Sequence, residues 1–250
     1  MQLPDLHTHT TFSDGEVSLE SLVQQEQKLG RVLGVSDHLF SCGMFTLENV
    51  RAYLHALSQY PVYRGVEVNM EHTLCLPDDI AGQLDYVIAS VHNVPDGHGG
   101  FIPLGEYFNK RSGNRSTYHQ NYGTELDELY LENTYKLIER AFAGQRIDIL
   151  GHITVMPMYD DLQGTAFAID WENAVISLCK KYEVSMEISG LWNAPNLGML
   201  QRANEAGVRF SSGSDCHRFS SIGVLEYVEQ AIAILHLDSD TFYLPSAAIS

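Results

Sequence analysis

The chain has 250 residues, of which 44% are hydrophobic, so one domain with a sizeable buried core is expected at this length. It carries 15 lysines and arginines against 32 aspartates and glutamates, which gives a formal net charge of −17. This charge argues against a nucleic-acid polymer or an anionic membrane as a partner, because both are bound through clustered basic residues.

Targeting and redox features of the sequence are few. No run of about 18 apolar residues occurs, so no transmembrane helix is expected. The first residues lack the basic and apolar regions of a secretory signal. The four cysteines show no CxxC spacing, which predicts reduced thiols in the cytoplasm rather than a disulfide framework; they are Cys42, Cys75, Cys179 and Cys216.

Short apolar runs rich in β-branched residues alternate with helical patterns along the chain. Strands are predicted over residues 3–7, 32–36, 62–67, 85–91, 147–151, 184–188 and 207–212. Helices are predicted after Ser18, after Thr46, over 126–143, after Asp170, over 197–206 and over 222–235. The alternation predicts an α/β fold with parallel strands joined by right-handed crossovers. Seven such strands in one chain favour a barrel or a strongly curved sheet.

The segment 93–125 is the one long stretch without a regular pattern, and it is rich in glycine, asparagine and aromatic residues. Connections of this length are uncommon and are often lids or binding loops. We therefore predict a lid or an insertion beside the site, with a solvated loop of no function as the alternative.

Histidine is the residue whose placement carries most information. Six of the eleven histidines fall at the carboxyl ends of predicted strands, namely His7, His9, His38, His92, His152 and His217. Four carboxylates fall at or just after the same ends, namely Asp14, Asp37, Glu67 and Asp215. Parallel α/β folds gather their sites at these ends, and residues i and i+2 of a strand face the same side. The remaining histidines are expected at the surface; they are His55, His72, His98, His119 and His236.

This combination of side chains predicts a metal site. Imidazole and carboxylate ligands without thiolate favour Zn²⁺, Mn²⁺ or Fe²⁺. The candidate ligands are too many for one tetrahedral ion, so two or three divalent ions with a bridging carboxylate are expected. Cys216 lies between two candidate ligands, but strand alternation points its side chain away, as expected for a small core residue.

The ordered set His7-x-His9, Asp14, Asp37-His38, Glu67, His92, His152 and Asp215-x-His217 resembles the motifs of the polymerase-and-histidinol-phosphatase (PHP) superfamily. The resemblance runs nearly end to end and implies one domain over 1–250, a distorted (β/α)7 TIM-like barrel with a metal cleft at the C-terminal ends of the strands. It implies one ion held by His7, His9, Glu67 and Asp215, a second by Glu67, His92 and His152, and a third by Asp14, His38 and His217. It also implies that Asp37 orients a ligand histidine.

Within the superfamily the chain is most similar to the histidinol-phosphate phosphatase group, which implies hydrolysis of a small phosphate monoester through a metal-activated water. The implied catalytic residues are Asp14, Glu67 and His217, with Asp14 or His217 protonating the leaving group.

Two stretches depart from the pattern of that group. The group usually carries an arginine shortly after the Gly-His motif and another after a Glu-Ile-Asn-Thr motif, yet residues 154–159 and 191–195 contain none. An arginine fork binds phosphate in a way that other side chains do not reproduce. The candidate phosphate-binding residues are instead Arg218, Lys110, Arg111 and Arg115, and Trp192 is a candidate for stacking on a flat substrate group.

Three alternatives stay open. The chain could act on another phosphate ester, such as a nucleotide, a phosphodiester or a different sugar phosphate. It could be a metal-binding module without catalysis. A TIM-type amidohydrolase also uses an HxH pair, but none of the five lysines falls at a predicted strand end.

Overall fold

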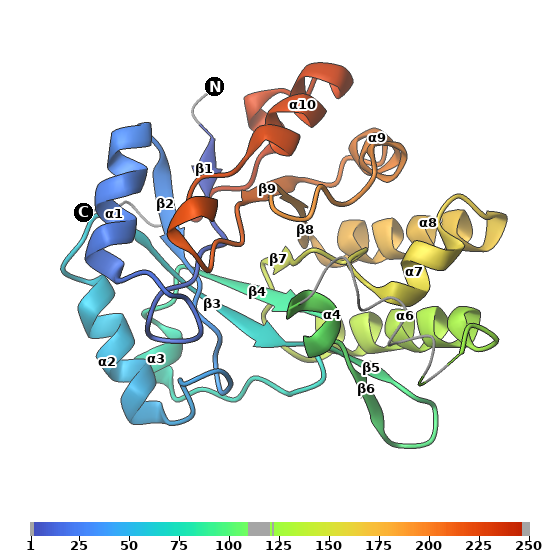
Figure 1. Ribbon diagram of the computed structural model, residues 1–250, viewed down its shortest axis with the longest axis horizontal. Coiled ribbons are helices and arrows are strands. Elements are labelled where there is room, and N and C mark those ends of the chain that lie inside the picture. Colours follow the sequence, from blue (N-terminus) through green and yellow to red (C-terminus); the bar gives the residue numbers. More distant parts are fainter. Residues whose placement is uncertain (1–2, 110–120, 122, 247–250) are drawn as a thin grey trace.

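A parallel sheet of seven strands forms the centre of the computed structural model, which describes residues 3–109, 121 and 123–246 (Figure 1). The strands lie in the order β1-β2-β3-β4-β7-β8-β9. Their bounds are Pro4–Asp5 (β1), Val32–Val35 (β2), Tyr63–Asn69 (β3), Tyr86–Ser90 (β4), Ile149–Leu150 (β7), Ser185–Ser189 (β8) and Phe210–Gly213 (β9). All seven predicted strands are present, and each runs parallel to its neighbours.

The first and last strands of the sheet meet, so the sheet is nearly closed. The amide of Leu6 donates to the Ser212 carbonyl at 3.0 Å, and the amide of Asp215 donates to the His7 carbonyl at 2.8 Å. Thr8 and Cys216 form a further parallel bridge. The predicted (β/α)7 barrel is thereby confirmed.

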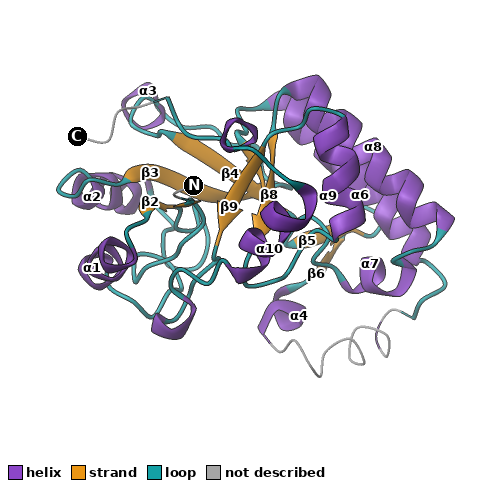
Figure 2. Ribbon diagram, turned by 90° about the horizontal axis from the view of Figure 1, so that it is seen from above, coloured by secondary structure: helices purple, strands orange, loops and turns teal. Residues whose placement is uncertain are grey.

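Helices cover the outside of the barrel between successive strands. Their bounds are Leu19–Leu29 (α1), Leu47–Leu57 (α2), Asp78–Ala81 (α3), Gly105–Asn109 (α4), Asp127–Gly144 (α6), Pro157–Leu162 (α7), Ala166–Tyr182 (α8), Leu197–Glu205 (α9) and Glu226–Leu235 (α10), with short 3₁₀ turns at Phe219–Ser221 (η1) and Ser239–Thr241 (η2). Figure 2 shows α1 and α2 together on one side and α6, α7 and α8 on the other. No helix in the described segments has the length and apolarity needed to cross a bilayer.

Capping residues set the starts of several helices. Ser18 accepts a hydrogen bond from the Ser21 amide at the start of α1, and Thr46 and Asn49 form a reciprocal capping box at the start of α2. Helix α8 begins earlier than the predicted start after Asp170. Thr165 caps the helix by accepting a hydrogen bond from the Ala168 amide. The first turn therefore lies before the helical pattern of apolar residues that begins after Asp170.

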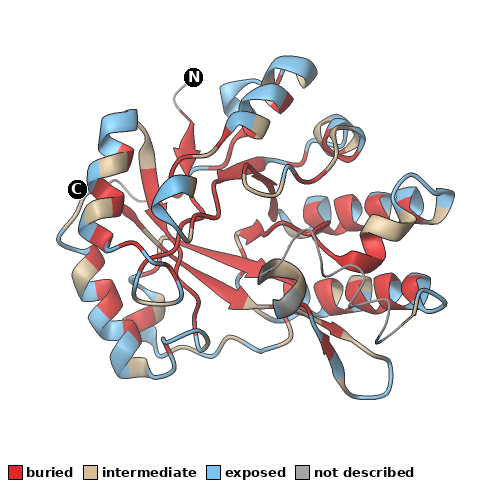
Figure 3. Cartoon of the chain, in the orientation of Figure 1, coloured by how far each residue is buried: buried red, intermediate tan, exposed pale blue. Residues whose placement is uncertain are grey.

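The strands and the inward faces of the helices are buried, while the outward helix faces are exposed (Figure 3). Tyr86 on β4 lies inside the barrel, is fully buried and donates its hydroxyl hydrogen to the Leu6 carbonyl at 2.6 Å. A Cβ at Gly65 on β3 would lie 2.2 Å from the Tyr86 ring, so only glycine leaves room for this residue. The aromatic ring thus fills the barrel interior without an unpaired hydroxyl.

The segment 93–125 is more regular than predicted. Its first part forms an antiparallel hairpin of Asn93–Pro95 (β5) and Phe101–Pro103 (β6), followed by α4. The Asp96 carboxylate accepts from the amides of His98 and Gly100, which closes the turn. Each strand of the hairpin has only three residues, and glycines lie between them. The alternation that indicates a strand is therefore too short to be recognised in the sequence.

A buried pair of carboxyl groups lies between α1 and β1. Asp5 and Glu26 are both fully buried, and Asp5 accepts a hydrogen bond from the Ser214 amide at 2.9 Å. Burial, together with the neighbouring Asp5, raises the pKa of Glu26 to about 8. Burial likewise raises the pKa of Asp5 to about 6. At neutral pH the Glu26 carboxyl therefore stays protonated, and its O–H group can form a hydrogen bond to the Asp5 carboxylate.

Replacing Glu26 with Gln is expected to stabilise the protein in alkaline solution. The raised pKa of Glu26, about 8, means that the folded chain keeps a proton that the unfolded chain has released, so wild-type stability falls as the pH rises toward 8. Glutamine stays neutral and can still donate to Asp5, so the Glu26→Gln variant should gain on the order of 2 kcal/mol near pH 8 and show a flatter pH dependence. Urea unfolding from pH 5 to pH 8 measures this. The Glu20→Gln variant, on an exposed position of the same helix, is the control. An equal gain at every pH would contradict the protonation argument.

Candidate metal centre

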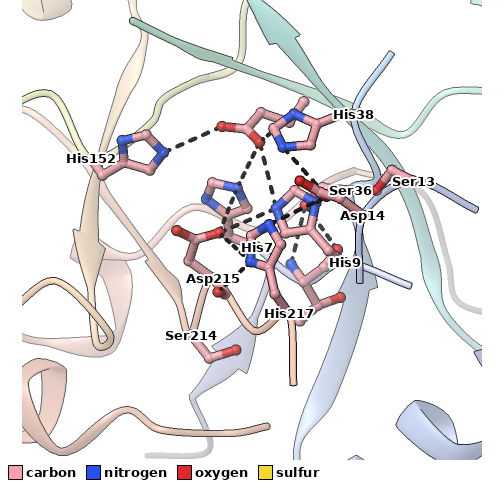
Figure 4. Close-up of polar contacts among 12 residues, drawn as sticks. His7, His9, Ser13, Asp14, Ser36, His38, His152, Ser214, Asp215 and His217 are labelled. Carbon is pink, nitrogen blue, oxygen red and sulfur yellow. Dashed lines mark hydrogen bonds and ion pairs between the residues drawn. The ribbon is translucent and has the colours of Figure 1, made fainter. Parts of the chain in front are cut away.

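The carboxyl ends of the barrel strands bring the six predicted histidines together. His7 and His9 follow β1, and the others follow β2, β4, β7 and β9. Figure 4 shows His7, His9, His38, His152 and His217 gathered around one point. Ring centroids lie 4.1 Å apart between His9 and His217, and 4.6 Å apart between His9 and His38. All six imidazoles therefore belong to one cluster at the mouth of the barrel.

Glu67 lies at the centre of this cluster and is 1% exposed. Its Oε2 lies 3.4 Å from His7 Nε2, 3.5 Å from His9 Nε2 and 3.0 Å from His38 Nδ1. Its Oε1 lies 3.3 Å from Nε2 of both His92 and His152. The two oxygens thus face different sets of histidines, which is the arrangement required of a carboxylate that bridges two ions.

Two aspartates complete the cluster on the side opposite His92 and His152. Asp215 Oδ1 lies 3.2 Å from His9 Nε2 and 3.6 Å from His217 Nδ1. Asp14 Oδ1 lies 3.4 Å from His217 Nε2 and 3.7 Å from His38 Nε2. The side chains of Asp14 and His217 are 42% and 32% exposed, whereas Glu67 and His9 are almost inaccessible. The cluster is therefore open to solvent on the side of Asp14 and His217.

The donor atoms of the cluster fit divalent ions. Several buried atoms have no hydrogen-bond partner within the described part of the chain: His7 Nε2, both ring nitrogens of His9, His38 Nδ1 and Glu67 Oε1. An unsatisfied buried polar group costs about 1–3 kcal/mol, so the fold would not gather several of them without a ligand. The donor atoms form four groups, and within each group they lie within 4.8 Å of one another. The groups are His9-Asp14-His38-His217, His7-Glu67-His152, His7-His9-Asp215 and His38-Glu67-His92. These nitrogen and oxygen donors suit ions such as Zn²⁺ and Mn²⁺.

Burial and the charges of neighbouring groups strongly shift the pKa values of the cluster residues. Burial lowers the pKa of His9 to about 3, and the neighbouring His217 acts in the same direction. Burial alone would lower the pKa of His217, but its hydrogen bond with Asp14 and the charge of Asp215 outweigh this and raise it to about 9. Burial would raise the pKa of Glu67, but the positive charges of His38 and His7 hold it well below its usual range. Imidazoles and ionised carboxylates at such short distances share charge, and a cation that displaces the imidazole protons would pair with the same carboxylates.

Two side chains that the sequence analysis did not assign fix the ring orientations. His7 Nδ1 lies 2.7 Å from Glu187 Oε1, and the amide of His152 donates to Glu187 Oε2 at 2.6 Å. His92 Nδ1 lies 2.7 Å from Asn69 Oδ1. These contacts place a proton on Nδ1 and leave Nε2 as the lone-pair nitrogen that faces Glu67. The signal was present in the sequence, because Asn69 stands two residues after Glu67 on the same face and Glu187 stands near the end of a predicted strand.

Space for Glu187 depends on a glycine of the neighbouring strand. A Cβ at Gly213 on β9 would lie 2.3 Å from Glu187 Oε1 and 2.4 Å from His7 Cβ. Only a residue without a side chain lets the carboxylate reach the imidazole at this point.

Asp37 does not have the role predicted for it. Instead of orienting a histidine, its carboxylate accepts hydrogen bonds from the amide and hydroxyl groups of Thr10 and Ser13, at 2.6–3.2 Å. Asp37 and His38 are neighbours in sequence, but their side chains have different partners, since His38 faces Glu67. Asp37 holds the loop that carries Asp14.

The predicted substrate-binding residues are placed unequally. Arg218 is exposed and forms an ion pair with Glu16 at 3.3 Å, so it does not contact the cluster. Trp192 does reach the cluster, where its indole Nε1 donates to Asp215 Oδ2. Lys110, Arg111 and Arg115 lie outside the described residues.

The residues predicted to be bystanders lie away from the cluster. His55, His72, His98 and His236 are exposed, and His119 lies outside the described residues. Cys216 is fully buried in the main apolar core, as predicted. All four cysteines are free thiols.

Comparison with known proteins identifies the family. The sequence profile of the PHP domain matches residues 5–189, and the chain therefore belongs to the PHP domain family. A probable phosphatase of Clostridium acetobutylicum is 27% identical over 247 residues, covering 92% of this chain and 85% of the relative. A probable phosphatase of Photobacterium profundum is 28% identical over 244 residues, covering 91% of this chain and 83% of the relative.

A solved structure shares the fold. The histidinol phosphate phosphatase of Lactococcus lactis, complexed with zinc, L-histidinol and phosphate, superimposes with a TM-score of 0.63 over 95% of both chains at 16% identity. At this identity the likeness shows a common barrel, and it agrees with the strand order described above.

Replacing Glu187 with Gln is expected to weaken metal binding about 10- to 100-fold, the usual effect of losing a carboxylate behind a ligand histidine. The glutamine side chain has one acceptor oxygen and one donor NH₂ group. Its oxygen can accept a hydrogen bond from the His7 ring or from the His152 amide, and its NH₂ group then faces the remaining N–H donor. Zinc affinity measured by competition with a chelator tests this. The Glu26→Gln variant, which changes an equally buried carboxylate outside the cluster, should bind zinc as the wild type does. Unchanged zinc affinity in Glu187→Gln would show that Glu187 only stabilises the barrel.

Proposed function

We propose that this PHP-domain chain is a metal-dependent phosphomonoesterase that hydrolyses a small phosphorylated substrate. The observation that carries the proposal is the largely buried cluster of six imidazoles and three carboxylates, whose unpaired nitrogen and oxygen atoms converge at the open end of the barrel. Relatives described as probable phosphatases over most of their length support it.

The proposed ligands are the nine residues predicted from the sequence: His7, His9, Asp14, His38, Glu67, His92, His152, Asp215 and His217. Glu67 is the natural bridge, because it belongs to two of the four donor groups. Two or three divalent ions held here would supply Lewis acidity, which lowers the pKa of a water molecule and neutralises the phosphoryl oxygens. We also propose that residues 1–250 form one PHP-type domain, in which 93–125 is an insertion beside the site.

The protein residues have distinct proposed roles. Asp14 and His217 are the most exposed members of the cluster and would face the leaving-group oxygen, where either could pass a proton to the departing alcohol. Glu67 and the buried histidines would hold the phosphate-binding face in place. Exclusion of water from the buried side strengthens every electrostatic contact there.

Histidinol phosphate is the reference substrate, since the barrel is shared with an enzyme solved with histidinol and phosphate. The absence of arginine from residues 154–159 and 191–195 favours a somewhat different ester. Phosphodiesters and nucleotides remain the comparison substrates. The acidic surface argues for a small substrate over a polyanion.

Removing the metal ions, or replacing Glu67 with Gln, is expected to lower phosphatase activity at least about 100-fold, because the bridge between donor groups is lost. The assay uses p-nitrophenyl phosphate, histidinol phosphate and bis-p-nitrophenyl phosphate after reconstitution with Zn²⁺ or Mn²⁺. Glu26→Gln is again the control and should keep wild-type activity.

The alternatives give different results in the same assay. Hydrolysis of the diester in preference to both monoesters would assign a phosphodiesterase. A protein that binds the metals tightly but hydrolyses none of these esters would be a metal-binding module, and the phosphatase proposal would be rejected.

A further inference from the structure

An aromatic surface adjoins the metal-ligand cluster on the side of His92 and His152. The ring of Phe108 in α4 meets the rings of His92, His152 and Trp192 edge to face, with centroid distances of 5.4, 5.5 and 5.3 Å. Trp192 also lies 6.3 Å from the His152 ring. Phe108 is thus in contact with two candidate ligands although it is far from both in sequence.

The position of Phe108 is fixed from both ends of its helix. The Leu104 amide donates to the His92 carbonyl at 2.9 Å, and the Phe108 amide donates to the Leu104 carbonyl at 3.0 Å. On the other side, the Tyr107 hydroxyl donates to Asp160 of α7 at 2.7 Å. Leu104 is buried, so the start of α4 is anchored in the core. These contacts hold the backbone of Phe108 on the barrel.

Trp192 is fixed in a different way. Its indole nitrogen donates to Asp215, and its backbone amide donates to the Ser189 hydroxyl at 3.4 Å. Both Phe108 and Trp192 are partly exposed, and the His92 side chain between them and Glu67 is 17% exposed. The two rings are therefore partly accessible to solvent on the His92 side of the cluster.

Among the described residues, no lysine or arginine forms an ion pair with the cluster, and Arg218 is directed to Glu16. The charged group bonded to Trp192 is the carboxylate of Asp215. What this surface offers to a substrate is flat apolar area, which binds flat rings better than it binds polyols.

We propose that Phe108 and Trp192 determine substrate specificity by binding a planar ring in the alcohol portion of the phosphate monoester. The inference rests on the proposed function, because it assumes that the phosphate lies on the cluster and the alcohol extends from it. A ring stacked on aromatic side chains gains up to about 1.4 kcal/mol beyond its area burial, which corresponds to a preference of about tenfold.

Three esters with alkyl leaving groups separate ring shape from chemical reactivity. They are 2-phenylethyl phosphate, 2-cyclohexylethyl phosphate and glycerol phosphate. The zinc-loaded wild type should show kcat/KM about tenfold higher for the phenyl ester than for the cyclohexyl ester, which has nearly the same size but is not flat. Phe108→Leu should remove most of this preference and leave glycerol phosphate hydrolysis within about twofold of the wild type.

The matched control is Phe101→Leu, which removes an exposed phenylalanine ring from the β5-β6 hairpin and should change none of the three rates. Zinc content is measured for each variant. An equal loss for all three esters in Phe108→Leu, or a fall in its zinc content, would assign Phe108 to support of the metal centre and overturn the specificity proposal. Equal rates for the phenyl and cyclohexyl esters in the wild type would also overturn it.

A binding measurement separates this proposal from the proposed function. The phosphonates 2-phenylethylphosphonate and 2-cyclohexylethylphosphonate bind without being hydrolysed, and calorimetry gives their affinities for the zinc-loaded protein. If no ester is hydrolysed, the phosphatase proposal fails, yet tighter binding of the phenyl compound would still support the aromatic surface. Equal binding of both phosphonates, or binding of neither, would overturn it whether or not turnover occurs.

Discussion

The carboxylate of Glu67 is the contact on which the site depends. It lies among five imidazoles in the mouth of the barrel, almost out of reach of water, and each of its oxygens faces a separate set of rings. A buried carboxylate is costly unless positive charge or hydrogen-bond donors surround it. Imidazoles that follow the parallel strands, one or two from a strand, lie around the carboxylate and offset this cost. The cluster is therefore a property of the whole barrel, since no two neighbouring strands could supply it.

Support for the cluster comes from the next layer of side chains. Glu187 and Asn69 orient His7 and His92, while Asp37 holds the loop that brings Asp14 to the open side. The insertion between β4 and β7 adds the aromatic face of Phe108. Among the described residues of the cluster, Asp14 and His217 are the most exposed, and His92 is partly exposed. A small ligand that reaches these side chains would therefore meet groups that are oriented from behind.

The fold could be predicted from the sequence almost completely, and the site in part. Runs of β-branched residues indicate the strand positions, and the histidines at the strand ends indicate the cluster. The start of α8 was misplaced because Thr165 lies outside the apolar pattern that was used to find the helix. The hairpin in the insertion was missed because three-residue strands carry almost no periodicity.

Roles that depend on side-chain direction were harder to predict. The family resemblance implies that Asp37 orients a ligand histidine, but its carboxylate accepts hydrogen bonds from Thr10 and Ser13. Arg218 was a reasonable phosphate ligand by position, yet its side chain lies beside Glu16. Phe108 reaches His92 through a helix whose path depends on tertiary hydrogen bonds, and no local pattern encodes such a path.

Gly213 shows how the site extends beyond the residues that would touch an ion. It contributes no side chain, yet a single added carbon would collide with both Glu187 and His7. In a survey of tolerated substitutions, this glycine should rank with the ligands themselves, although it has no chemistry of its own. The set of residues that cannot be substituted without damage to the centre is consequently larger than the set that would contact an ion, and it includes a backbone position of β9.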